Sequence, residues 1–135
     1  MNIKEVLLER HSKDITSSII DYIYDNPTEF ESVFQLFLCD SNPIVRQRAA
    51  WVIGHIGVDS PSYIMPYLEQ LVDNFTKKGH HNAIYRNTVR VLQSIKIPTE
   101  LQGKVVTTCF DMVSNSKTAI AIKAFSMTIL YKISN

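Results

Sequence analysis

The fold is decided by the stretch Ile44-Val45-Arg46-Gln47-Arg48-Ala49-Ala50-Trp51-Val52-Ile53-Gly54-His55-Ile56-Gly57. Its apolar residues Val45, Val52, Ile53 and Ile56 have the spacing of one face of an α-helix. The same spacing returns 39 residues later at Ile84, Val91, Leu92 and Ile95, and 77 residues later at Ile122, Ile129, Leu130 and Ile133. Recurrence at this period predicts an array of helical repeats, which generally offers a binding surface rather than a catalytic pocket.

A second apolar helix pattern precedes each of these three helices. Phe30, Val33, Phe34 and Phe37 match Leu68, Leu71, Val72 and Phe75, which in turn match Val106, Cys109, Phe110 and Val113. We therefore expect three helical hairpins in residues 27–57, 61–96 and 98–135, with second helices at 43–57, 82–96 and 117–134. Ile19, Ile20 and Ile23 match the apolar residues of the helix at 43–57 more weakly, which predicts an N-terminal cap or partial repeat in residues 1–26. The whole chain, 1–135, is expected to form a single domain.

Proline and glycine mark the ends of the expected helices. Pro43 and Pro61 each follow polar capping residues and are predicted at first helical positions, where a missing N–H costs nothing. Gly57 and Gly79 follow apolar runs and are predicted as C-terminal caps. Pro66 either kinks the helix around it or marks the true start of that helix.

The chain resembles the HEAT-like repeats, antiparallel helix pairs that stack into an α-superhelix. The resemblance is carried by Ile64-Met65-Pro66-Tyr67-Leu68 in a first helix, and by Asn42-Pro43 with the stretch up to Gly57 in a second. The string around Ala49-Ala50-Trp51 is also similar to phycobilisome-lyase-like and DNA-alkylation-repair-like members. The later repeats depart from it: Thr88-Val89 and Ser126-Met127 replace the alanine pair, and Gln93 and Tyr131 replace Gly54. The resemblance implies an all-α, right-handed superhelix of about three hairpins plus the cap.

Composition fits an ordinary globular protein. Of 135 residues, 45% are hydrophobic and 20% charged, and the net charge is +1. The charge is uneven, with −5 in residues 1–42 and +6 in residues 43–135, so the C-terminal part can attract an anionic partner. Cys39 and Cys109 fall in apolar helical patterns and are expected to be buried free thiols. The N-terminal residues have the pattern of neither a signal peptide nor a membrane span, and a cytoplasmic protein is the default expectation.

Non-core positions of the second helices form the expected binding surface. In HEAT-like arrays these helices line the concave face, so equivalent positions form ladders across the repeats. Tryptophan, tyrosine and arginine are common hot-spot residues, and guanidinium groups pair with carboxylates or phosphates. The predicted partner-binding residues are Tyr22, Arg48, Trp51, His55, Arg86, Asn87 and Arg90. The leading interpretation is a non-catalytic adaptor that captures a protein or peptide, although Trp51 could instead pack between helices.

An alternative function is nucleic-acid binding. Residues 77–90 carry four fixed positive charges and no acid, and Tyr85 could stack on a base. Against this interpretation, the sequence pI is only about 7.8, whereas nucleic-acid modules tend to be strongly basic. A third interpretation, an accessory enzyme or lyase-like chaperone, is suggested by the family resemblance alone.

The sequence predicts no catalytic, cofactor or metal site. His80 and His81 are adjacent on a predicted turn, with no cysteine or acid nearby to complete a zinc site. No phosphate-binding glycine loop, nucleophile elbow or zinc-protease helix motif occurs. Asp21 and Asp25 are most simply explained as a solvated helix face.

The last predicted helix is apolar over more than half of its circumference, although a terminal repeat normally has a polar outer face. This pattern predicts self-association through Ile120, Phe125 and Tyr131, or docking on another chain. The simpler alternative is deep packing of this helix against the helices at 82–96 and 99–115.

Overall fold

The computed structural model describes residues 1–135 and is entirely helical. Its α-helices are α1 (Ile3–Glu9), α2 (Lys13–Asp25), α3 (Phe30–Cys39), α4 (Pro43–Asp59), α5 (Leu68–Phe75), α6 (Asn82–Leu92), α7 (Thr99–Ser114) and α8 (Ile120–Ser134). Short 3₁₀ turns cover Pro27–Glu29, Pro61–Tyr63 and Met65–Tyr67.

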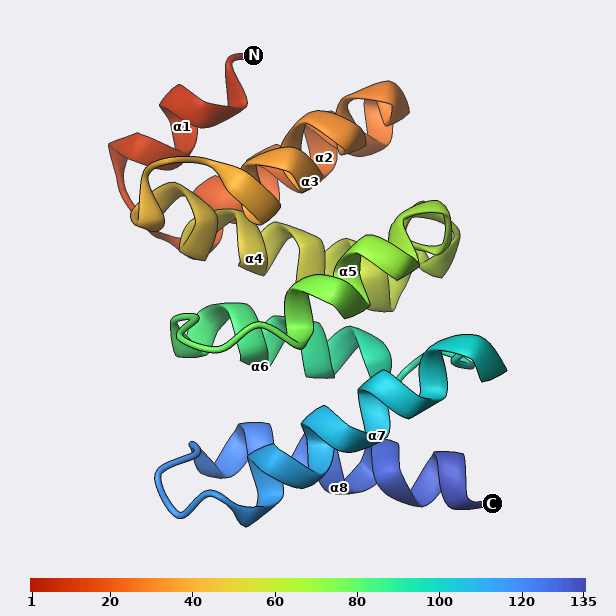
Figure 1. Ribbon diagram of the computed structural model, residues 1–135. Helices are drawn as coiled ribbons and strands as arrows, with labels where there is room; N and C mark the ends of the chain where they lie inside the picture. Colours follow the sequence, from red (N-terminus) through yellow and green to blue (C-terminus); the bar gives the residue numbers. More distant parts are fainter.

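The helices form hairpins that stack along one direction. Figure 1 shows this stack, from the N-terminus at the top to the C-terminus at the bottom of the view. α3 packs against α4 and α7 against α8, while α4, α6 and α8 lie next to one another as one layer and α5 packs against α7 in the other. One hydrophobic core runs through the stack from Ile3 in α1 to Ile129 in α8.

Local capping explains where several helices begin. The side-chain oxygen of Asn42 accepts a hydrogen bond from the backbone N–H of Ile44 at 2.9 Å, and Pro43 takes the first helical position, as predicted. Ser12 caps α2 in the same way, through the N–H of Ile15. These caps satisfy N–H groups that have no partner inside the helix.

The structure corrects several predicted helix ends. α4 continues past Gly57 to Asp59, and Gly57 is buried where an added side chain would overlap Val91 of α6. Gly79 does have a left-handed backbone, with φ of 88°, but it lies in the loop after α5. Pro66 lies in a 3₁₀ turn, so α5 starts only at Leu68.

The second helices of the later hairpins are shorter than predicted, because α6 ends at Leu92 and α8 starts at Ile120. The expectation of two buried thiols is wrong for Cys39, which is exposed at the end of α3, whereas Cys109 is buried. None of the helices combines the length and the apolar character needed to cross a membrane.

Candidate partner-binding site

Two hollows lie on the face formed by the second helices. The first, of about 540 Å³, is lined by residues of α4, the start of α6 and the start of α8. The second, of about 590 Å³, lies between the start of α2, α4 and α6. Trp51 and His11 line both hollows. We call the two hollows together the Trp51 groove.

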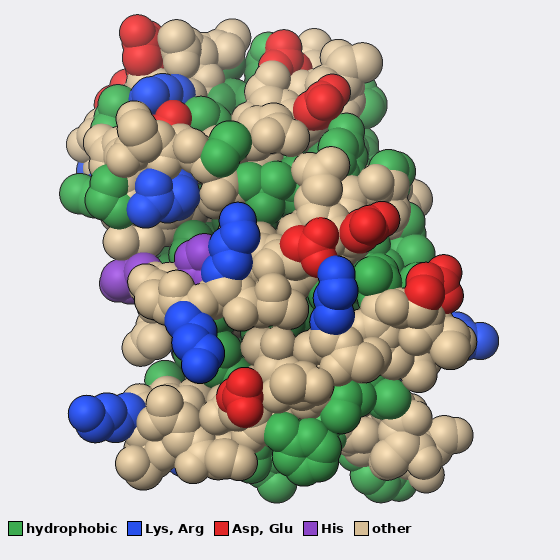
Figure 2. Space-filling view, in the orientation of Figure 1, with side chains coloured by type: hydrophobic (Ala, Val, Ile, Leu, Met, Phe, Trp, Pro, Cys, Tyr) green, Lys and Arg blue, Asp and Glu red, His purple; other side chains and the backbone are tan.

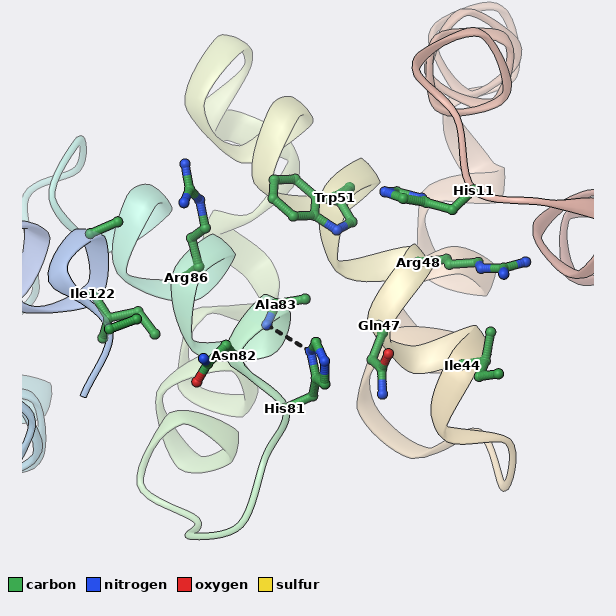
Figure 3. Close-up of a pocket in the computed structure, with 12 residues that line it drawn as sticks. His11, Ile44, Gln47, Arg48, Trp51, His81, Asn82, Ala83, Arg86 and Ile122 are labelled. Carbon is green, nitrogen blue, oxygen red and sulfur yellow. Dashed lines mark hydrogen bonds between the residues drawn. The ribbon is translucent and has the colours of Figure 1, made fainter. Parts of the chain in front are cut away.

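Trp51 is half-buried and lies at the centre of this groove. The guanidinium carbon of Arg86 is 5.8 Å from the centre of the indole ring, within cation–π range. The ring of His11 is 6.0 Å away on a tilted plane. Figure 3 shows Trp51 lying between these two side chains, which come from distant parts of the sequence. An aromatic surface is thus held beside positive charge.

The groove contains no acidic side chain. Its charged lining residues are all basic: Lys13, Arg48, Arg86 and Arg90. The ion pairs of the protein lie elsewhere, between Lys4 and Asp40 at 3.0 Å and between Lys104 and Asp73 at 2.7 Å. The guanidinium groups of Arg86 and Arg90 therefore have no carboxylate partner within the protein and are free to bind an anion.

Arg48 has a different position from the other two arginines. One of its guanidinium nitrogens donates a hydrogen bond to the backbone carbonyl of Leu7, at 2.8 Å. That carbonyl is near the end of α1, where backbone acceptors lack partners within the helix. Figure 3 shows the Arg48 side chain pointing away from Trp51. Arg48, predicted as a partner-binding residue, thus holds α1 against α4.

His55 lies at the second hollow and is exposed. Partial burial lowers the pKa of its imidazole below the ordinary value of 6.5, and the positive charge of Arg90 lowers it further. His55 is consequently neutral at pH 7, where it offers hydrogen bonding rather than a further positive charge.

Two predicted ladder residues do not line the groove. Asn87 is only 1% exposed, and its amide donates to the carbonyl of Ala83 at 2.9 Å. The prediction that Asn87 contacts a partner is wrong, because α4 and α6 approach closely at Gly54 and cover it. Tyr22 is half-buried against the core and lines neither hollow.

The residues that α2 does contribute were missed by the sequence reasoning. They are Lys13, Thr16 and Ser17, together with His11 and Ser12 just before the helix. The repeat register placed Tyr22 at this position instead, because the register is weak in the N-terminal cap. The sequence signal for these residues was the pair of basic residues at the start of α2, since His11 and Lys13 flank the capping serine.

The basic segment of residues 77–90 is less accessible than predicted. Tyr85 is only 9% exposed, and its hydroxyl donates to the carbonyl of Lys77 at 2.6 Å, so its ring is not available for stacking on a base. His81 caps α6 by accepting from the N–H of Ala83 at 3.0 Å, and a ring nitrogen of His80 lies 2.8 Å from the carbonyl oxygen of Asn74. The histidine pair thus organises the loop, and nowhere do three metal-ligating side chains come together.

At the C-terminal end, the predicted self-association residues fall into two groups. Ile120 is 86% exposed and Tyr131 is 70% exposed. Phe125 is half-buried and packs against the core, on another side of α8. Phe125 thus lies apart from the two exposed residues, and self-association through these residues stays a prediction.

Comparison with known proteins agrees with this architecture. A family model described as a HEAT repeat domain matches residues 3–135. The chain belongs to the HEAT repeat family. The match confirms the all-helical HEAT-like fold that the recurring apolar register predicts. No curated protein and no solved structure gave a match.

Proposed function

We propose that this HEAT repeat protein is a non-catalytic binding module that captures an acidic segment of a partner protein in the Trp51 groove. The observation that carries the proposal is the combination of one half-buried tryptophan with two arginines, Arg86 and Arg90, that have no carboxylate partner. HEAT repeats generally mediate protein interactions, which supports a protein as the partner.

The chemistry of the groove favours carboxylates on the partner. A guanidinium group can bind a carboxylate through two parallel hydrogen bonds, which makes arginine better suited than lysine to this recognition. The adjacent indole offers apolar contact area for the side chains or backbone between two acids. Such tryptophan and arginine pairs supply much of the binding free energy at protein interfaces.

The dimensions of the groove suit an extended peptide segment. Two hollows that meet at one tryptophan can accept neighbouring side chains of the same segment, one on each side of the indole. The first hollow is lined by apolar as well as basic residues, including Ile44, Ala83 and Ile122. We therefore expect an apolar residue of the partner in the first hollow and an acidic one beside Arg90 in the second.

Nucleic acid fits this groove less well. Binding of a single strand generally combines a long basic track with several aromatic stacking platforms. Tyr85 is buried, which leaves Trp51 as the one phenylalanine, tyrosine or tryptophan side chain in the groove. We do not propose nucleic-acid binding, and it serves as an opposing outcome of the tests.

A peptide-display selection tests the proposed function. The immobilised protein is expected to enrich peptides that carry Asp or Glu next to an apolar residue, and Trp51→Ala is expected to abolish their binding. Met65→Ala is the matched control, because Met65 is 44% exposed and lies outside the groove. No enrichment, or enriched peptides that bind Trp51→Ala as well as the original protein, would refute the proposal.

We also propose that the protein works in the cytoplasm. Cys39 is an exposed free thiol, a state that a reducing compartment maintains.

A further inference from the structure

The last hairpin exposes apolar residues at positions that the earlier hairpins bury. In the first helices, Phe34 of α3 and Val72 of α5 are completely buried, but the equivalent Phe110 of α7 is 57% exposed. In the second helices, Ala50 of α4 and Val89 of α6 are completely buried, but the equivalent Met127 of α8 is 58% exposed. The exposed residues Phe110 and Met127 are therefore large apolar side chains at positions that the earlier repeats keep in the core.

Contacts in the earlier hairpins show what these positions do. Gly54 of α4 lies against Asn87 of α6, and its equivalent in α8 is Tyr131. The ring of Phe34 lies 4.9 Å from that of Tyr67, in the turn that leads into the next hairpin. These positions therefore form the interface between one hairpin and the next. On α7 and α8 the residues at the same positions, Phe110, Met127 and Tyr131, are exposed.

We call the surface formed by these exposed positions of α7 and α8 the C-terminal face. It includes a hollow of about 580 Å³ between α7 and α8, lined by Val106, Val113 and Leu130 with Phe110, Met127 and Tyr131 around them. No charged residue lines this hollow. Figure 2 shows hydrophobic side chains gathered at this end of the stack, at the bottom of the view. Depletion of charge with exposed aromatic and methionine side chains is typical of an interface core.

We propose that the C-terminal face binds the C-terminal face of a second copy of this chain, forming a two-fold symmetric dimer. In this arrangement α7 and α8 of one copy pack on α7 and α8 of the other, and so continue the helix-on-helix stacking between α4, α6 and α8. The exposed rings of Tyr131 and Phe110 enter the hollow of the partner copy. A two-fold axis makes one surface serve both copies, so a single self-complementary face is sufficient.

The opposite end of the stack argues against a head-to-tail arrangement. The N-terminal helices α1 and α2 expose five acids, Glu5, Glu9, Asp14, Asp21 and Asp25. Packing an apolar face on such a surface would remove water from charged groups without pairing them. A second C-terminal face has less of this cost, because the hollow at its centre has no charged lining residue.

The size of the C-terminal face suits a weak dimer. α7 has 16 residues and α8 has 15. Two such helices side by side measure about 24 Å by 20 Å, or roughly 500 Å² in projection. The accessible area of an uneven surface exceeds its projection, and stable interfaces bury about 800 Å² per partner. We therefore expect a small, reversible interface whose occupancy depends on protein concentration.

Sedimentation velocity and light scattering from low to several hundred micromolar protein test the proposal. The expected result is a mass that rises from 15.4 kDa with concentration and levels off at twice that value. A mass that remains at one chain throughout would overturn the proposal. A mass that grows without levelling off would also overturn it, because open chains form by head-to-tail contacts.

Two variants assign the dimer to the C-terminal face. Tyr131→Lys and Met127→Lys are each expected to leave the protein monomeric over the same range. Both residues are mostly exposed, so the far-UV circular dichroism and melting temperature should stay close to those of the original monomer. Met65→Lys, an exposed apolar residue elsewhere, is expected to leave the dimer intact. Dimerisation that survives both α8 substitutions would contradict the assignment.

Discussion

Gly54 of α4 packs directly against Asn87 of α6, and the distance between these two helices depends on the absence of a side chain at Gly54. A Cβ atom there would lie 2.9 Å from the amide carbon of Asn87 and would overlap its oxygen. Asn87 is itself fixed, because it is buried and its amide donates to Ala83. The pair thus sets the distance between α4 and α6, and residues of these two helices line the Trp51 groove.

Gly54→Ala is expected to lower the free energy of unfolding by about 1–2 kcal/mol. Overpacking in a core costs about 1–3 kcal/mol, and alanine recovers up to about 1 kcal/mol of helix propensity. Urea unfolding followed by circular dichroism measures the change. In a protein that already carries Asn87→Ala, the substitution Gly54→Ala should lower the free energy of unfolding much less. An equal cost in both backgrounds would show that the two residues do not interact.

Gly103→Ala is the matched control for the substitution at Gly54. Gly103 lies inside α7, and an added Cβ there meets no atom within 4 Å. Because alanine favours the helix without a clash, this variant should be more stable by about 0.5–1 kcal/mol. A loss of stability there would contradict the packing that we describe for α7.

Arg48 and Arg86 are predicted to respond differently to the same substitution. Arg48→Met removes the hydrogen bond to Leu7 and should lower the free energy of unfolding by about 1.5–3 kcal/mol, with faster hydrogen exchange in α1. Arg86→Met removes a side chain with no hydrogen bond or ion pair, and the loss of its cation–π contact with Trp51 should lower the free energy of unfolding by less than about 1 kcal/mol. Unchanged exchange in α1 of Arg48→Met would show that Arg48 does not hold that helix.

The two cysteines are predicted to differ in reactivity. Cys39 is exposed, whereas burial raises the pKa of the Cys109 thiol to about 11, so its reactive thiolate is scarce at pH 8. An aromatic disulfide reagent should modify one thiol per chain rapidly and the second only after denaturant is added. Cys39→Ser should remove the rapid phase. Two rapid phases in the native protein would contradict the burial of Cys109.

Stability at acid pH is predicted to depend on Asp40. Hydrogen bonds from the backbone N–H of Asn42 and from Lys4, both at 3.0 Å, lower the pKa of this carboxyl below its ordinary value of 3.8. Asp40 binds a proton more readily in the unfolded chain than in the folded protein. The contribution of Asp40 to the free energy of unfolding is therefore complete above pH 3.8, and it is lost as the pH falls through the lowered pKa of the folded state.

Unfolding of Asp40→Asn at pH 6 and at pH 2.5 measures this contribution. The variant should be less stable than the original protein at pH 6, and the difference should shrink at pH 2.5. Lys4→Met should reduce the effect without removing it, because the bond from Asn42 remains. A difference that is the same at both pH values would show that Asp40 does not titrate as described.

The sequence predicts the stack well because its signal lies in buried residues. Val45, Ile53 and Ile56 repeat in register, and a residue at these positions has to be apolar whatever surrounds it. Helix ends are less predictable: α4 continues past Gly57 because that glycine is needed for contact with Val91, not for a cap. Pro66 illustrates the same point, since a 3₁₀ turn accommodates it without a kink.

The candidate site is only partly predictable, because side chains at one position of the ladder have different surroundings in each repeat. Trp51, Arg86 and Arg90 reach the groove, whereas Asn87 is covered by the close approach at Gly54. Arg48 faces α1, a contact across 41 residues of sequence that no helical period reveals. Long-range packing of this kind determines which exposed position remains free to bind.

Fluorescence of Trp51, the single tryptophan of the chain, tests the central claim most directly. The probe is a 12-residue peptide of alternating glutamate and serine with one central phenylalanine, compared with its glutamine analogue and with single-stranded DNA of 12 nucleotides. The acidic peptide is expected to change the emission saturably.

Arg86→Gln and Arg90→Gln should each weaken the binding of this peptide about 5-fold to 20-fold, which corresponds to about 1–1.8 kcal/mol. Lys96→Gln, the same loss of charge at an exposed site outside the groove, should change the dissociation constant less than 2-fold. No change in emission, equal binding of the glutamine analogue, or tighter binding of the DNA would contradict the claim that this groove recognises an acidic segment of a protein.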